Sequence, residues 1–134
     1  MLDIMKSEKT TLLGGNVILW QLKEGLRASI DAVLLAAYAP VKDEARVLDL
    51  GCGAGQSGLC LAARVQGAQI LGIDIQEALI ELAQKNAQEN DWAGRCTYTV
   101  QDIRALKGQD ADHVLCNPPY LESGAWSGLS LIHI

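Results

Sequence analysis

Several features are scarce in this 134-residue sequence, and each scarcity excludes a class of protein. Proline occurs three times, and 49% of the residues are hydrophobic against 20% charged, which excludes a disordered chain. No apolar run approaches the roughly eighteen residues of a membrane span, and the opening segment MLDIMKSEKT lacks the apolar core of a signal peptide. We therefore expect one globular domain at most, located in the cytoplasm and without a membrane partner.

The four cysteines lack the spacing of a metal site. None of Cys52, Cys60, Cys96 and Cys116 belongs to a C-x-x-C motif, and each lies among apolar residues. Cysteines of this kind are most often buried free thiols. We expect four buried thiols, no disulfide and no metal.

Positive charge is also in short supply. The chain has 11 Lys and Arg against 16 Asp and Glu, a net charge of −5, which argues against a broadly basic nucleic-acid surface. Residues 1–30 carry a net charge of +1 and the remainder carries −6. Any contact with a polyanion is therefore expected from the amino-terminal arm.

The segment around which the chain is organised is 47–55, VLDLGCGAG. Its apolar run ends at three glycines in alternate positions, Gly51, Gly53 and Gly55. This pattern predicts a buried strand, a tight loop and the start of a helix. Glycine lets the backbone adopt a positive φ and approach a ligand closely, and the N–H groups at the helix start face that ligand. The loop indicates a nucleotide-type ligand without identifying it.

Alternating periodicities predict an α/β chain. The expected elements are a hairpin over 11–21 that turns at Gly14-Gly15-Asn16, a helix from Ser29 or Asp31 to Ala39, strands at 46–50, 69–73, 97–100 and 112–116, and helices at 56–65 and 76–90. An exposed Glu81–Lys85 pair is expected on the last helix. Strands that alternate with helices form right-handed βαβ units, so the expected fold is a doubly wound parallel sheet of about four strands.

Polar residues follow each of these strands. The carboxyl ends of parallel strands meet at one edge of the sheet, where ligands bind. At that edge Asp74 can bind a ribose diol or cap the next helix, and Asp102 can accept from the amine of a base or cap a turn. Asp49 lies inside a strand and needs N–H groups or a cation, so it can support the loop or reach a ligand ammonium group.

The motif Asn117-Pro118-Pro119-Tyr120 follows an apolar strand. The two prolines fix the backbone, so the Asn117 amide oxygen and the Pro118 carbonyl are held rigidly. Both accept hydrogen bonds, and together they can hold an –NH₂ group with its lone pair aimed at an electrophile. Tyr120 offers a flat face for stacking. Alone the motif would indicate a Pro-rich turn, but after the glycine loop it indicates an amine-binding site.

The segments VLDLGCGAG, GIDIQ, QDI and NPPY, in this order, resemble the S-adenosylmethionine-dependent class I methyltransferases with an NPPY motif. The resemblance implies a Rossmann-like fold and S-adenosyl-L-methionine as cofactor. The cofactor contacts that it implies are Asp49, Gly51, Cys52, Gly53, Gly55, Asp74, Ile75, Asp102 and Ile103. Within this set the glycines line the methionine part, Asp74 binds the ribose hydroxyls, and Asp102 with Ile103 contacts the adenine.

The same resemblance implies the catalytic residues. Asn117 and Pro118, with Pro119 and Tyr120, would hold and stack the target amine for in-line attack on the methyl group. Positioning and desolvation do most of this work, so no metal and no covalent nucleophile is expected.

The N-terminal segment 12–40 points to a particular family among these methyltransferases. It is similar to the start of the bacterial tRNA(valine) adenine N6-methyltransferase family, which has a short arm and a D-x-x-L-L-x-x-x-x-P helix. That pattern is present here as Asp31, Leu34, Leu35 and Pro40. The implied reaction is methyl transfer to the exocyclic amine of an adenine, with tRNA as the partner. Ser29 and Asp31 can close over the cofactor, although helix capping is the simpler role.

The resemblance covers about residues 25–120. We divide the chain into a hairpin and helix over 1–45, a partial cofactor-binding core over 46–120, and a tail over 121–134 that matches nothing expected of the family. Family members have a sheet of seven strands. We therefore expect a C-terminally truncated domain that is marginally stable and inactive alone, because its sheet edge and core are incomplete.

Other functions fit parts of the pattern. A protein glutamine N5-methyltransferase would present the same –NH₂ group, but its family carries a separate helical domain for which about 46 leading residues leave no room. A DNA adenine methyltransferase must flip its base from a duplex, which an acidic chain grips poorly. An NAD-binding module would need G-x-G-x-x-G and would leave NPPY without a task. An inert fragment that only binds the cofactor remains the alternative outside enzymes.

Overall fold

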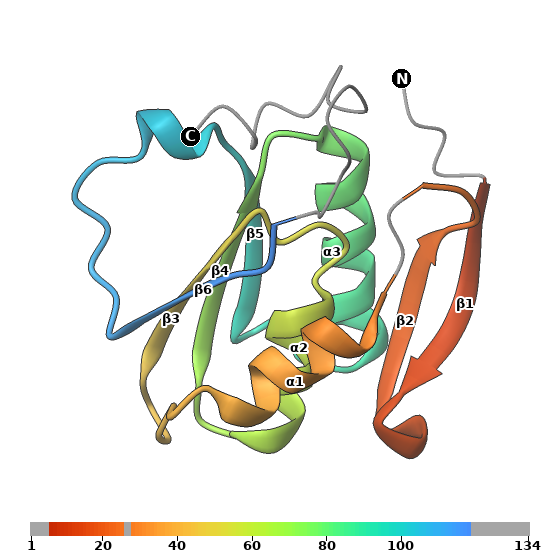
Figure 1. Cartoon of the computed structure of the whole chain (residues 1–134), viewed down its shortest axis with the longest axis horizontal. Helices are drawn as coiled ribbons and strands as arrows, with labels where there is room; N and C mark the ends of the chain where they lie inside the picture. Colours follow the sequence, from red (N-terminus) through yellow and green to blue (C-terminus); the bar gives the residue numbers. More distant parts are fainter. Residues whose placement is uncertain (1–5, 26–27, 119–134) are drawn as a thin grey trace.

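The computed structural model describes residues 6–25 and 28–118. They form a four-stranded parallel sheet and a two-stranded antiparallel hairpin (Figure 1). The elements are β1 (Ser7–Leu12), η2 (Leu13–Gly15), β2 (Val17–Leu22), α1 (Ile30–Tyr38), β3 (Arg46–Leu50), α2 (Gln56–Arg64), β4 (Gln69–Asp74), α3 (Glu77–Glu89), β5 (Cys96–Val100), η3 (Ile103–Ala105) and β6 (His113–Cys116). The predicted order of strands and helices is confirmed, with ends that differ by one or two residues after the hairpin.

The sheet has the strand order β5-β4-β3-β6, and every pair in it is parallel. The steps from β3 to β4 and from β4 to β5 run in one direction, so right-handed crossovers place α2 and α3 on the same face. β6 lies on the other side of β3, and the segment 101–112 that leads to it runs along the opposite face (Figure 1). The strand order therefore reverses between β3 and β6, which is where sheets of this kind bind ligands.

The core lies between the sheet and its helices. Alternate residues of the strands, among them Val47, Ile70 and Tyr98, are buried beneath α2 and α3. The predicted inward residues of α3 are all buried, namely Leu79, Leu82, Ala83 and Ala87. Each large aliphatic side chain buried in this way contributes about 1.5–3 kcal/mol, so this face carries most of the stability of the described chain.

The predicted hairpin is confirmed, but it begins earlier than expected. β1 starts at Ser7, in a polar stretch that hydrophobicity does not mark as a strand, and its side chains are exposed or half-buried. In the turn, Gly14 and Gly15 have φ of 64° and 95°, as a tight turn requires. Asn16 has φ of −73°, so the positive φ values of the predicted turn segment belong to its two glycines.

Two surface predictions are also wrong. Cys116 is exposed, because it alternates with the buried Leu115 and points to the face opposite the helices, whereas Cys52, Cys60 and Cys96 are buried as predicted. None of the ion pairs among the described residues joins Glu81 to Lys85. Lys85 Nζ lies 3.6 Å from the centroid of the Trp20 ring, so it covers the hairpin instead.

Within the described ranges, every helix is too short or too polar to cross a bilayer.

Candidate functional site

The glycine loop adopts the conformation that its spacing predicts. Gly51, Gly53 and Gly55 have φ of 65°, 58° and 93°, in the left-handed region that side chains rarely adopt. The loop is tied down by its own backbone: Cys52 N–H donates to Ile73 O at 3.0 Å, and Gly55 N–H donates to Cys52 O at 2.9 Å. Gly55 occupies the N-cap position of α2 and offers no side-chain cap. The first N–H groups of α2 therefore follow directly on this loop.

Asp74 connects the loop to the end of β4. Its Oδ2 accepts from Gly53 N–H at 2.9 Å and its Oδ1 accepts from Gln76 N–H at 2.9 Å. The N-cap position of α3 belongs to Gln76, so Asp74 does not cap that helix itself. The side chain is 2% exposed, and its two bonds leave further lone pairs on both oxygens. Asp74 thus fixes the glycine loop of β3 against the start of α3.

Asp49 lies beneath the loop. It is fully buried in β3, and a Cβ built on Gly58 of α2 would lie 3.3 Å from its Oδ2. Burial raises the pKa of Asp49 to about 7, while the Gly58 backbone N–H lowers it and the charge of Asp74 raises it. Neither Asp49 Oδ2 nor the buried Tyr98 hydroxyl has a hydrogen-bond partner among the described residues. This position favours a supporting role for Asp49 over direct contact with a ligand ammonium group.

Cys52 and Ile75 flank the same strand ends. Cys52 is buried, and a Cβ on Gly72 would lie 2.9 Å from its sulfur. Burial raises the pKa of the Cys52 thiol far above its ordinary range, with the charges of Asp49 and Asp74 acting in the same direction. The thiol is therefore an apolar packing group. Ile75, half-buried, follows Asp74 directly.

Asp102 lies just beyond β5, where Gln101 N–H donates to Asp74 O at 2.9 Å. Its Oδ1 accepts from Arg104 N–H at 2.9 Å, which caps the turn that contains Ile103. The Arg104 guanidinium also donates to both oxygens, and these bonds lower the pKa of Asp102 to about 2. The capping alternative is therefore realised, with the carboxylate still 29% exposed at the edge.

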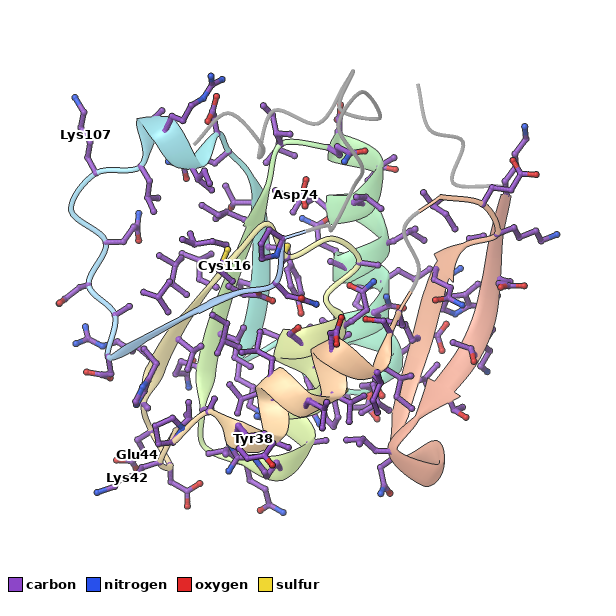
Figure 2. The ribbon with its side chains drawn as sticks, viewed as in Figure 1. Tyr38, Lys42, Glu44, Asp74, Lys107 and Cys116 are labelled. Atoms are coloured by element: carbon purple, nitrogen blue, oxygen red, sulfur yellow. The ribbon has the colours of Figure 1, made fainter. Side chains whose placement is uncertain are left out.

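Asn117 and Pro118 come directly after β6. Cys116 pairs with Leu50, so Asn117 follows its strand at the level where Gly51 follows β3. Asn117 is half-buried and Pro118 is exposed. Figure 2 shows Asp74 and Cys116 at the same end of the sheet, whereas Tyr38 and Glu44 lie at the other end. Pro119, Tyr120 and the tail 121–134 lie outside the described residues.

The predicted role of Ser29 as a cap is not realised. Ser29 occupies the N-cap position of α1, but its side chain makes no capping hydrogen bond, and Asp31 lies in the first turn.

Sequence reasoning missed one residue that touches the loop. Asn86 of α3 is fully buried, and its Nδ2 donates to Ala54 O at 2.8 Å. A polar residue among the inward Leu82, Ala83 and Ala87 was the signal that could have found it.

The arrangement brings the ends of β3, β4 and β5 together with the glycine loop. Asp74 contributes hydrogen-bond acceptors, the Asp102 carboxylate is paired with Arg104, and the loop contributes backbone N–H groups. Such a set suits a ligand that carries hydroxyl groups. Among the described residues, no group of three or more His, Cys, Asp and Glu is placed to hold a metal ion.

Known proteins are similar to this chain in sequence and in fold. Among the curated relatives is the tRNA1(Val) (adenine(37)-N6)-methyltransferase of Shewanella sediminis, 32% identical over 110 residues, which are 77% of this chain and 45% of the relative. The enzyme of that name from Vibrio campbellii is 31% identical over 127 residues, or 92% of this chain and 53% of the relative. The chain thus spans about half the length of the curated relatives it matches.

Two solved structures show the same fold. An S-adenosylmethionine-dependent methyltransferase from Geobacter sulfurreducens, in complex with S-adenosyl-L-homocysteine, has a TM-score of 0.59 and 28% identity over 66% of this chain and 36% of that one. An RNA methyltransferase from Salinibacter ruber, also with S-adenosyl-L-homocysteine, has a TM-score of 0.59 and 28% identity over 69% of this chain and 60% of that one. The family model described as methyltransferase small domain matches residues 28–131. With the glycine loop and Asp74 placed as described, this chain belongs to the methyltransferase small domain family.

Proposed function

We propose that this chain is the cofactor-binding part of an S-adenosylmethionine-dependent N-methyltransferase that methylates the exocyclic amine of an adenine in tRNA. The names of the curated relatives support the reaction and the tRNA substrate, and the solved neighbours with S-adenosyl-L-homocysteine support the cofactor. Because the chain spans about half of those relatives, catalysis by this chain alone is a separate question.

One observation carries the cofactor assignment: the glycine loop and Asp74 form a single hydrogen-bonded unit at the end of β3 and β4. Gly51 and Gly53 have positive φ and carry no side chain to obstruct a close backbone approach, and the hydrogen bonds of Asp74 leave further lone pairs that could accept from a ribose diol. The acceptors of Asp74 and the N–H donors of the loop therefore fit a nucleoside that carries an amino-acid group. Asp74 and Ile75 would hold the ribose, and Asp102 with Ile103 the adenine.

The residues buried beneath the glycine loop would stabilise its conformation without touching the cofactor. Asp49 and Cys52 are buried under the loop, so we assign them to fixing it from beneath.

The amine would be held at the end of β6. When bound, the cofactor supplies an electrophilic methyl group on its sulfonium. The Asn117 amide oxygen and the Pro118 carbonyl would accept hydrogen bonds from the target –NH₂, which orients its lone pair and holds it out of water. Pro119 would stiffen the segment and Tyr120 would stack on the base. Modification of tRNA would place the protein in the cytoplasm.

Calorimetric titration with S-adenosyl-L-homocysteine tests the cofactor assignment. The 134-residue chain should bind in the micromolar range, and Asp74→Ala should abolish binding. Asp110→Ala is the matched control, because Asp110 is an exposed acid paired with Arg46 at the other end of β3. A folded chain that does not bind, or an equal loss in both variants, would refute the assignment.

Methyl transfer tests the substrate. In the chain extended to the length of its relatives, labelled S-adenosylmethionine should methylate tRNA from a strain that lacks the enzyme. Asn117→Ala should abolish transfer while leaving S-adenosyl-L-homocysteine affinity unchanged. Label on a glutamine-containing release-factor peptide, with none on tRNA, would instead identify the protein glutamine methyltransferase.

A further inference from the structure

Asn86 of α3 and Asn90, which occupies the C-cap position of that helix, satisfy the backbone groups on the free edge of the hairpin. Asn86 Oδ1 accepts from Trp20 N–H at 2.6 Å and its Nδ2 donates to Trp20 O at 2.9 Å. Asn90 repeats the pattern with Ile18, accepting from its N–H at 2.8 Å and donating to its O at 2.7 Å. Residues four apart on a helix are separated by about 6 Å along its axis and residues two apart on a strand by about 6.6 Å. The spacing of the two asparagines therefore fits the strand.

Asn86 makes one contact that Asn90 does not. Its Nδ2 also donates to Ala54 O of the glycine loop at 2.8 Å, whereas the second Nδ2 bond of Asn90 goes to Asn86 O at 2.8 Å within α3. Each side chain makes three hydrogen bonds, and Asn86 is fully buried. Asn86 and Asn90 thus bind the backbone of β2 in the same way, but of the two only Asn86 also binds the glycine loop.

Packing connects the same parts. Leu22 of β2, Ala54 of the loop, and Leu79 and Leu82 of α3 form one buried cluster, with Trp20 packed against it. Lys85 lies over the outer face of this arrangement, 3.6 Å from the Trp20 ring centroid. The hairpin is therefore joined to the loop by this apolar cluster as well as through the Asn86 amide.

The hydrogen bond from Asn86 restrains the peptide unit between Ala54 and Gly55, whose orientation depends on few other contacts. Ala54 O is held by Asn86, and the N–H of the same peptide unit, on Gly55, is held by Cys52 O at 2.9 Å. The residues on either side, Gly53 and Gly55, both have positive φ, and glycine resists rotation of a peptide plane least of all residues. Removal of the Asn86 amide leaves this peptide held on one side only.

We propose that the hairpin β1–β2 positions the glycine loop through Asn86, so that Asn86 is a positioning residue for the ligand that the loop binds. The proposal rests on the proposed function for the identity of that ligand. By linkage, any molecule that bound and shifted the hairpin would change the affinity of the loop, and a ligand on the loop would change the affinity for that molecule by the same factor.

The test compares Asn86→Ala with Asn90→Ala in the 134-residue chain. Each variant loses three hydrogen bonds, and each should lose free energy of unfolding in urea, more for Asn86→Ala because Asn86 is fully buried and Asn90 is half-buried. Calorimetry with S-adenosyl-L-homocysteine should then separate them: about ten-fold weaker binding for Asn86→Ala, the equivalent of one hydrogen bond, and no more than about two-fold for Asn90→Ala. An equal change in affinity would overturn the proposal, because a purely structural role predicts it.

A second pair of variants changes the hairpin instead of Asn86, and it tests the same proposal if Asn86→Ala does not fold. Trp20→Ala removes the packing against the buried cluster that contains Ala54 and should weaken binding, whereas Ile18→Ala, on the Asn90 side, should not. Equal effects of Trp20→Ala and Ile18→Ala would overturn the proposal.

Amide NMR separates this proposal from the cofactor assignment. The Gly53 and Gly55 resonances should shift in Asn86→Ala and stay in place in Asn90→Ala, with no ligand added. If the unsubstituted chain fails to bind S-adenosyl-L-homocysteine and these shifts are seen, the cofactor assignment fails and the positioning role stands. If the shifts are absent, the positioning role fails.

Discussion

The ring of Tyr98 lies directly across Gly72 of the neighbouring strand, so that a Cβ on Gly72 would sit 2.4 Å from Tyr98 Cδ1. The glycine therefore makes room for the largest side chain beneath the loop. The Tyr98 hydroxyl reaches on toward Gly55, where an added Cβ would lie 2.9 Å from it. Tyr98 thus links the middle of the sheet with the start of α2.

This contact predicts that Gly72→Ala destabilises the chain. The added methyl group overlaps the ring, and Tyr98 is buried, so the expected loss is about 1–3 kcal/mol or a failure to fold. Urea denaturation measures it. Gly94→Ala is the control, because its Cβ would meet nothing within 4 Å, and it should change stability by less than about 0.5 kcal/mol. Similar effects of the two variants would contradict the prediction.

The buried carboxyl of Asp49 predicts a pH dependence of stability. Its pKa is raised from 3.8 to about 7, so between these values the folded chain holds a proton that the unfolded chain releases. The free energy of unfolding should therefore fall as the pH rises from about 4 to about 7, by up to about 1.4 kcal/mol per unit, and level off above. Asp49→Asn should remove this part of the slope. Parallel pH curves for the two proteins would show that Asp49 titrates normally.

The pairing of Arg104 with Asp102 predicts a change in acidity. Hydrogen bonds from Arg104 lower the pKa of Asp102 to about 2, and Arg104→Met removes the side-chain bonds while the backbone bond stays. The pKa of Asp102 should then rise toward its ordinary value of 3.8, as followed by carboxyl-carbon NMR during titration. Arg64→Met, whose guanidinium binds the end of α1 instead, is the control and should leave Asp102 as it was.

The hydrogen bonds of Arg95 predict that this side chain stabilises the C-terminal end of α2. Its guanidinium donates to Ala62 O at 2.7 Å and Val65 O at 3.0 Å, at the end of α2 where carbonyl groups lack helical partners. Arg95→Met keeps the aliphatic stem and should cost about 1.5–3 kcal/mol, measured by urea denaturation. Arg46→Met removes an exposed ion pair with Asp110 and should cost no more than about 1 kcal/mol. A larger loss at Arg46 would reverse this ranking.

Local signals in the sequence were enough for the succession of strands and helices along the chain and for the glycine loop. The alternate glycines predicted positive φ because no other residue adopts it at low cost, and the structure has it at Gly51, Gly53 and Gly55. The acids at strand ends followed from the rule that parallel strands end at one edge, which brought Asp74 to Gly53.

Long-range contacts were beyond that reasoning. Asn86 and Trp20 are 66 positions apart, and nothing in either neighbourhood marks them as partners. The exposure of Cys116 depends on what covers the outer face of β6, which the apolar character of its strand does not reveal. For Asp102 the sequence left two roles open, and only the placement of Arg104 distinguished them.

The asparagine pairing of β2 also bears on how the chain avoids self-association. A strand with unpaired N–H and C=O groups recruits other strands, and most proteins guard against this with charge, proline or a further strand. Here side-chain amides from a helix satisfy the backbone of Ile18 and Trp20, the groups through which a second hairpin would attach. Asn86 and Asn90 therefore also protect the hairpin against adding strands from another molecule, so their loss would expose a site for domain swapping or fibril growth.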